Sequence, residues 1–141
     1  AVGVKVGGRD DRDIVDVFAT PQEELARLLW HDQSKAPDPS KMTEAQRQIM
    51  QANRVALGLY TWEPYMHNPK LPRWLHRIDV PTLVLWGESD GLVTPDYGRA
   101  YAGMIPSAEF AVIPEAGHAP QVEQPDDFVK KVQSFASDGA V

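Results

Sequence analysis

Asp90 and His118 are the two side chains of this sequence whose types and surroundings are best suited to acid–base chemistry. A carboxylate that accepts a hydrogen bond from one imidazole nitrogen fixes the tautomer of the ring and stabilises the imidazolium, while the other nitrogen takes a proton from a nucleophile. Gly117 gives the backbone freedom to present His118. Taken singly, an acid in such a position is often only a turn former, and a histidine beside glycine is often only a loop residue. The pair predicts two thirds of a catalytic triad if the fold brings both residues together.

The elements around this pair are those that would bring it together. Residues 82–86 are continuously apolar, as a strand covered on both faces must be, and residues 109–113 form a second short strand. A helix starting at residues 94–95 connects them. The order of strand, helix, strand and helix predicts a right-handed parallel crossover, and therefore an α/β fold. In open α/β sheets, ligands bind outside the carboxyl ends of the strands. Asp90 and His118 each lie in the loop that follows one of the two predicted strands.

Helices dominate the sequence before the first strand. Thr20 offers an N-cap hydroxyl before a proline and a glutamate, which predicts a helix from about Pro21 to His31. A second capping box at Thr43 precedes apolar residues that share one helix face, namely Ala45, Ile49, Ala52, Ala56 and Leu59. A last helix opens at Pro125, and we expect its apolar residues to pack inward, namely Phe128, Val132 and Phe135.

Aromatic residues gather in the segment from Trp62 to Pro72. Its three prolines exclude a regular helix and a central strand, so the segment is predicted to be an aromatic loop. Trp62, Tyr65 and Met66 are candidates for lining an apolar substrate pocket, with packing in the core as the alternative.

Several linked motifs give the segment from Leu71 to Phe135 a resemblance to the carboxyl-terminal part of the α/β-hydrolase superfamily. They are residues 75–78 and 80–87, then Asp90, Val93 and Pro95, then Ile105-Pro106, then residues 116–118 with Pro120, Glu123 and Pro125. The resemblance implies that Asp90 and His118 are the triad acid and histidine. It also implies three segments: the end of a core strand and a loop (1–13), a helical cap or lid (14–76), and the carboxyl-terminal part of the hydrolase core (77–141). The cap rests on position and not on motif.

The nucleophile of such a triad is not evident in this sequence. In the superfamily the nucleophile elbow normally precedes the cap, and the chain opens at Ala1 and not at Met, so we expect a carboxyl-terminal fragment without a nucleophile. Residues 87–91 formally satisfy G-x-S-x-G around Ser89. An elbow requires a helix directly after the serine, whereas residues 92–95 intervene here, so we interpret Ser89 as part of a turn.

Composition limits the partners. The 141 residues carry a formal net charge of −6 and no Lys/Arg cluster, which argues against nucleic acid and anionic membranes as partners. No apolar run is long enough for a membrane span. The sequence has no cysteine, and His31, His67 and His76 lack the spacing of metal ligands, so we expect no metal. No cofactor is implied, the cytoplasm is the default location, and the oligomeric state is open.

The sequence therefore predicts a hydrolase that cleaves an ester or a similar bond of a small, apolar substrate. His118 would act as general base and then acid, and Asp90 would orient it, while this fragment alone would be inactive. The alternatives within the superfamily are hydrolysis of a C–C bond, an epoxide or a haloalkane, or a member that binds a ligand without catalysis. An autonomous small α/β binding module is a further alternative, disfavoured because two strands leave sheet edges open.

Overall fold

The structure is a computed structural model that describes residues 2–138; Ala1 and residues 139–141, at the outer ends of two of the predicted segments, lie outside the described residues. The first half holds the helices α1 (Gln22–Leu29), α2 (Glu44–Thr61) and α3 (Pro72–Leu75), with 3₁₀ turns η1 (Gln33–Lys35) and η2 (Pro39–Lys41). The second half holds β1 (Thr82–Gly87), α4 (Pro95–Ala102), β2 (Ala108–Ile113), α5 (Pro120–Glu123) and α6 (Pro125–Asp138).

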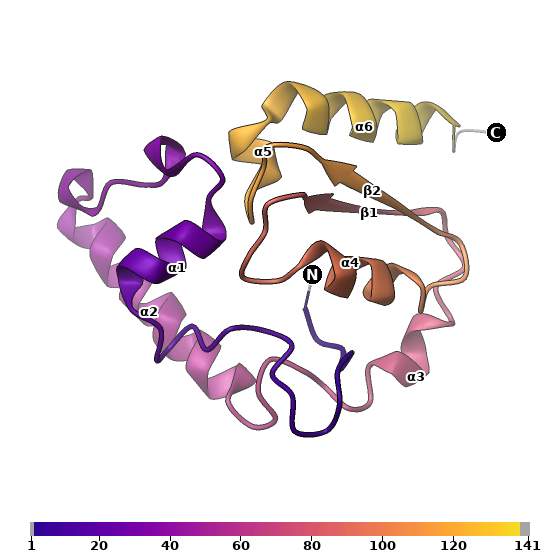
Figure 1. Cartoon of the computed structure of the whole chain (residues 1–141), viewed down its shortest axis with the longest axis horizontal. Coiled ribbons are helices and arrows are strands. Elements are labelled where there is room, and N and C mark those ends of the chain that lie inside the picture. The colour runs from indigo at the N-terminus through magenta and orange to yellow at the C-terminus, as the bar shows by residue number, and fades with distance from the viewer. Residues whose placement is uncertain (1, 139–141) are drawn as a thin grey trace.

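The two strands form a parallel sheet, which confirms the predicted strands and the α/β fold class. The register runs from Thr82 opposite Ala108 to Gly87 opposite Ile113, and α4 makes the crossover. α4 covers one face of the sheet and α6 lies over the other, and both strands point towards α1 (Figure 1). The loops that follow the strands therefore lie next to the helical first half.

The core lies between the sheet and α4 and extends into the first half through Val4, Ile14, Leu25, Met66 and Leu75. Trp86 of β1 is 4% exposed and packs against the ring of Tyr97 of α4 at a centroid distance of 6.4 Å. The indole Nε1 of Trp86 donates a hydrogen bond to the carbonyl of Val93 (2.7 Å), so the polar atom of this large ring is satisfied inside the core. This bond also fixes the segment between β1 and α4, in which Asp90 lies.

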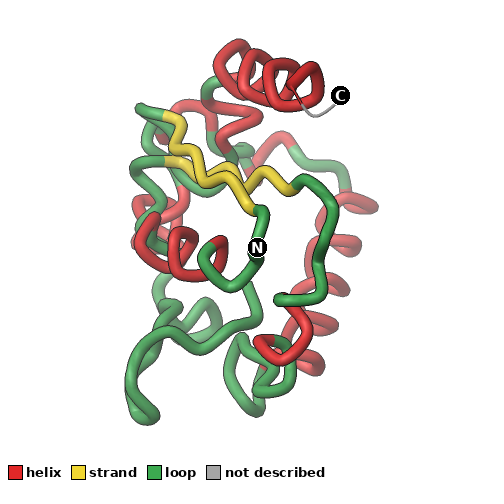
Figure 2. The backbone as a smooth tube through the Cα atoms, turned by 90° about the vertical axis from the view of Figure 1, so that its right-hand side faces the viewer, coloured by secondary structure: helices red, strands yellow, loops and turns green. Residues whose placement is uncertain are grey.

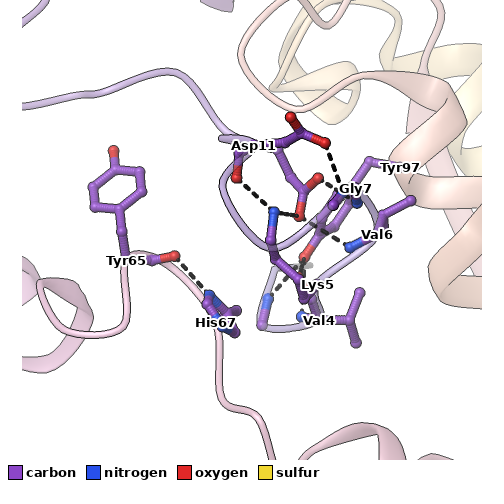
Figure 3. Close-up of polar contacts among 11 residues, drawn as sticks. Val4, Lys5, Val6, Gly7, Asp11, Tyr65, His67 and Tyr97 are labelled. Carbon is purple, nitrogen blue, oxygen red and sulfur yellow. Dashed lines mark hydrogen bonds and ion pairs between the residues drawn. The ribbon is translucent and has the colours of Figure 1, made fainter.

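The opening segment is tied to α4 by the hydroxyl group of Tyr97. This oxygen accepts hydrogen bonds from the amides of Gly3 and Val4 (both 3.0 Å) and donates one to the Val4 carbonyl (2.9 Å), as Figure 3 shows for Val4. Gly3 also forms an isolated parallel bridge with His67. These contacts connect the start of the chain to both halves of the structure.

The two predicted capping boxes had different outcomes. At α2 the prediction is confirmed, because Thr43 Oγ1 accepts from the Gln46 amide (3.2 Å) and Gln46 Oε1 accepts from the Thr43 amide (2.8 Å). At α1 the helix is present, but the N-cap assigned to Thr20 is wrong, since Pro21 holds that position without a side-chain bond. The cause is a turn organised by Asp16, whose backbone carbonyl accepts from the Thr20 amide (2.9 Å).

The apolar stripe of α2 lies on the surface of the described structure. No residue of this 18-residue helix is buried, and Ile49, Val55 and Leu59 are 61%, 58% and 80% exposed. The helix stands apart from the sheet in both views of the backbone (Figures 1 and 2). The inward position expected for Val132 of α6 is likewise wrong, since the side chain is 41% exposed. A two-stranded sheet is too narrow to cover the whole apolar stripe of a helix.

Candidate active site

Asp90 is a buried acid at the carboxyl end of β1. It is 5% exposed, and its Oδ1 accepts hydrogen bonds from the amides of Leu92 (3.1 Å) and Val93 (3.0 Å). A buried carboxylate is costly unless it is hydrogen-bonded, and these two amides satisfy one of its oxygens. They also turn the chain, so Asp90 is a turn former as well, and its Oδ2 is left for another partner.

His118 supplies that partner from the loop after β2. Its Nδ1 lies 2.8 Å from Asp90 Oδ2, so the fold brings the two residues within hydrogen-bond distance. Because a carboxylate can only accept, Nδ1 carries the proton and donates it, so that Nε2 is the basic nitrogen. The side chain of His118 is 41% exposed, compared with 4% for that of Asp90. This arrangement can accept a proton at Nε2 and stabilise the resulting imidazolium.

The end of α1 anchors both loops through backbone hydrogen bonds. The carbonyl of Leu28 accepts from the amide of Gly91 (2.9 Å), and the carbonyl of Leu29 accepts from the amide of His118 (2.7 Å). A Cβ on Gly117 would lie 2.3 Å from the Leu29 carbonyl oxygen, so this close approach requires glycine. The positions of both candidate residues therefore depend on α1 as well as on the sheet.

A small cavity adjoins the pair. It has a volume of about 100 Å³, and its lining residues are Leu85, Trp86, Gly87, Asp90, His118 and Pro120. Pockets for small organic ligands are typically about 300 to 1,000 Å³, so this cavity alone can hold only part of a substrate.

Trp62, Tyr65 and Met66 lie at a different cavity. They line a space of about 330 Å³ together with residues 4–5 and 9–14, and this space shares no lining residue with the cavity at Asp90. Trp62 is 59% exposed and its ring meets that of Phe18, whereas Met66 is 7% exposed. The structure does not bring these three residues to the Asp90–His118 pair, and their role in substrate binding stays a prediction.

Tyr65 and Asp13 at this second cavity have shifted pKa values. Burial raises the pKa of Tyr65, against the opposing hydrogen bond from the Val17 amide (2.9 Å). Burial also acts to raise the pKa of Asp13, but hydrogen bonds from two backbone amides and from Lys5 outweigh it and lower that pKa. Lys5 makes a further bond to the Asp11 carbonyl (Figure 3). Lys5, Asp11 and Asp13 at the edge of this cavity are thus joined by hydrogen bonds.

Ser89 lies next to the pair without joining it. Its Oγ is 2.8 Å from Nδ1 of His31, a residue that follows α1, while Nδ1 of His118 faces Asp90. The next helix, α4, begins only at Pro95. A nucleophile elbow places the helix directly after the serine, so this geometry agrees with the interpretation of Ser89 as a turn residue.

Comparison with known proteins identifies the fold. The family described as alpha/beta hydrolase fold matches residues 20–125, which is most of the chain. The chain belongs to this family. Within the family, it is 27% identical over 132 residues to a 2-hydroxy-6-oxo-6-phenylhexa-2,4-dienoate hydrolase of Burkholderia cepacia, covering 91% of this chain and 41% of that protein.

Two solved α/β-hydrolase structures are also similar. A serine hydrolase involved in carbazole degradation, the CarC enzyme, has a TM-score of 0.56 at 26% identity, over 68% of this chain and 35% of that one. A thermophilic esterase from Thermogutta terrifontis has a TM-score of 0.50 at 34% identity, over 52% and 27%. The chain spans well under half the length of the curated relatives it matches, from 18% to 41% for the first three.

Residues 2–138 hold neither a membrane-spanning helix nor a cluster of metal-ligating side chains. No helix in that range is long and apolar enough to cross a membrane. The same residues contain no group of three or more His, Asp or Glu side chains placed to hold a metal ion.

Two contacts near the site have little signal in the sequence. Glu123 was noted only as part of a motif, and its carboxylate bonds the amide of Gly117, next to His118. The spacing of His31 argues only against a metal ligand, and the residue is exposed but contacts Ser89. Because polar residues such as Gln121 and Gln124 surround Glu123, no local pattern marks the first contact.

Proposed function

We propose that the protein containing this chain is a hydrolase in which His118 and Asp90 serve an upstream nucleophile. The 2.8 Å hydrogen bond between His118 Nδ1 and Asp90 Oδ2 carries the proposal. His118 Nε2 takes the proton of the nucleophile as it attacks, and Asp90 stabilises the imidazolium. His118 then returns the proton to the leaving group. In the second half of the reaction, His118 takes a proton from a water molecule, which attacks the intermediate and releases the product.

The nucleophile and the oxyanion-binding amides are assigned to a part of the protein outside residues 1–141. This assignment is supported by the length comparison, since the chain corresponds to 41% of the dienoate hydrolase. Residues 14–76 act as a helical cap, residues 1–13 lead into it, and residues 77–141 complete the core. The chain by itself is expected to be inactive, because attack and charge stabilisation need the absent groups.

Two substrate classes are proposed. Ester hydrolysis is supported by the similarity to the thermophilic esterase at 34% identity. Cleavage of a C–C bond in a 2-hydroxy-6-oxo-dienoate is the second candidate, because the match to the dienoate hydrolase extends over 91% of this chain. In either case a small, apolar substrate is expected, with Trp62, Tyr65 and Met66 as candidate contacts.

The test uses the full-length enzyme with a panel of p-nitrophenyl esters and a 2-hydroxy-6-oxo-dienoate. We expect turnover of one class and a loss of at least 10³-fold in kcat for His118→Gln, consistent with removal of a triad member. His76→Gln is the matched control, because His76 is an exposed histidine that precedes β1. Binding of these compounds without turnover would favour the non-catalytic alternative, and full activity of His118→Gln would refute the mechanism.

A further inference from the structure

Glu123 is a carboxylate enclosed by the structure close to His118. The residue is 1% exposed, at the end of the short helix α5. Its Oε2 accepts a hydrogen bond from the amide of Gly117 (2.6 Å), and its Oε1 accepts one from the amide of Asp32 (2.9 Å). Burying a charged group at this depth is costly unless hydrogen bonds compensate, so both contacts are needed in the folded state.

The two amides held by Glu123 belong to different parts of the structure. Gly117 directly precedes His118 in the loop after β2, and Asp32 lies just beyond α1, in the segment assigned to the cap. Lys35 of the same segment donates to the main-chain carbonyl of Glu123 (2.5 Å). The carboxylate therefore bridges the histidine loop and the segment that follows α1.

This bridge completes the support of the His118 backbone. The amide of Gly117 is held by Glu123, and the next amide, that of His118, is held by the carbonyl of Leu29 (2.7 Å). Two consecutive peptide groups are thus fixed, and they set the direction in which the imidazole leaves the chain. A displacement of about 1 Å in a catalytic group is enough to cost about 10²-fold in rate.

We propose that Glu123 is a positioning residue that holds His118 in line with Asp90 and couples this alignment to the docking of the segment after α1. The proposal rests on the proposed function of His118. Glu123 contacts backbone amides, so it acts through His118 and not on the substrate. A purely structural role is the alternative, in which its loss lowers stability alone.

The test is Glu123→Gln in the full-length enzyme. Glutamine keeps one acceptor oxygen, but its NH₂ group meets one of the two backbone N–H donors, so one amide must move. We expect kcat to fall at least tenfold, with KM within about twofold, in assays well below the unfolding temperature. Glu115→Gln is the matched control: an exposed residue of the same loop with the same chemical change, expected to leave kcat within twofold.

A second background separates positioning from stability. In His118→Gln enzyme, Glu123→Gln should lower the residual rate no further, whereas its effect on Tm should be the same in both backgrounds. An equal fold-loss in both backgrounds, or a folded Glu123→Gln enzyme with kcat within twofold of wild type, would overturn the proposal. If Glu123→Gln does not fold, Glu123→Asp takes its place. It keeps the charge but is one methylene too short to hold both amides, and the same criteria apply.

The proposed function and this inference fail in distinguishable ways. Full activity of His118→Gln would remove the proposed function, whatever Glu123→Gln does. In that case, the alignment of His118 with Asp90 can be measured without activity, from the NMR resonance of the His118 Nδ1 proton. We expect this signal to shift or broaden in Glu123→Gln and to stay unchanged in Glu115→Gln. An unchanged signal in Glu123→Gln would overturn the inference independently of activity.

Discussion

Replacement of Asp90 by asparagine tests the candidate site most directly, because it changes one atom and keeps the shape. In the structure, Oδ1 of Asp90 accepts from the amides of Leu92 and Val93, and Oδ2 faces Nδ1 of His118 at 2.8 Å. Asparagine can keep the two amide contacts through its single oxygen. Its NH₂ group then faces His118 and can only donate.

The change from an acceptor to a donor opposite His118 determines the expected loss in kcat. With a donor in front of it, Nδ1 must accept, so the proton of the neutral imidazole moves to Nε2 and the base is lost. The same tautomer change in a serine protease lowers kcat about 10⁴-fold, and we expect a loss of that order here. Such a loss corresponds to about 5 kcal/mol of transition-state stabilisation. Stability should fall much less, by about 1–3 kcal/mol, because one charge-assisted hydrogen bond is exchanged for a neutral one.

The assay compares kcat of full-length wild type, Asp90→Asn and Asp96→Asn on the best substrate found, with urea unfolding of each. Asp96 is an exposed acid in the first turn of α4 and serves as the control, with kcat expected within twofold of wild type. If folded Asp90→Asn retained more than about a tenth of wild-type kcat, the tautomer argument would be refuted. Equal losses in both variants would point to a general electrostatic effect.

Two further predictions follow from close contacts elsewhere. Gly117→Ala places a Cβ 2.3 Å from the Leu29 carbonyl oxygen. We therefore expect urea unfolding to show a destabilisation of about 1–3 kcal/mol, and kcat to fall. Gly103→Ala is the control, because its Cβ would have its nearest neighbour at 3.5 Å, and it should change neither quantity. Asp13→Asn should remove part of the acid dependence of stability. The pKa of Asp13 is lowered in the folded state, despite burial, by hydrogen bonds from two amides and Lys5. Its contribution is therefore present above the unfolded pKa of about 3.9 and is lost as the pH falls through the folded value. Wild type should lose its advantage over Asp13→Asn in urea unfolding between pH 5 and about pH 2, and a constant difference over that range would contradict this assignment.

The sheet and the Asp90–His118 pair were predictable because their signals are local. The apolar run at 82–86 and the short segment 109–113 predicted β1 and β2 to within a residue at each end. Parallel pairing then places the loops after both strands at one edge, and Asp90 and His118 are among the titratable residues of these loops. The topology therefore accounts for the proximity of Asp90 and His118, but not for the contacts that set their orientation.

The contacts that hold the pair in place were not predictable in the same way. The carbonyl groups of Leu28 and Leu29 anchor both loops, and every residue type carries such a carbonyl, so no side chain marks these positions. The failure at Thr20 has a similar cause. Thr20 has a hydroxyl that could cap the helix. However, the Thr20 amide takes part in a turn with Asp16, and Pro21 occupies the N-cap position. At Thr43 no such competitor intervenes, and the local signal decided the outcome.

These backbone contacts connect the helical first half directly to the loops of the candidate site. If α1 belonged to a mobile lid alone, it would contact the catalytic loops mainly through side chains that can separate. Instead, the backbone carbonyls of Leu28 and Leu29 accept hydrogen bonds from the backbone amides of Gly91 and His118, respectively. Backbone bonds of this kind hold a fixed spacing, since no rotamer change can release them. Movement of α1 away from the sheet would therefore release the His118 loop as well. Among the described residues of the proposed cap, the end of α1 carries these bonds to the loops of the site, whereas no such bond joins those loops to α2, with its exposed apolar stripe.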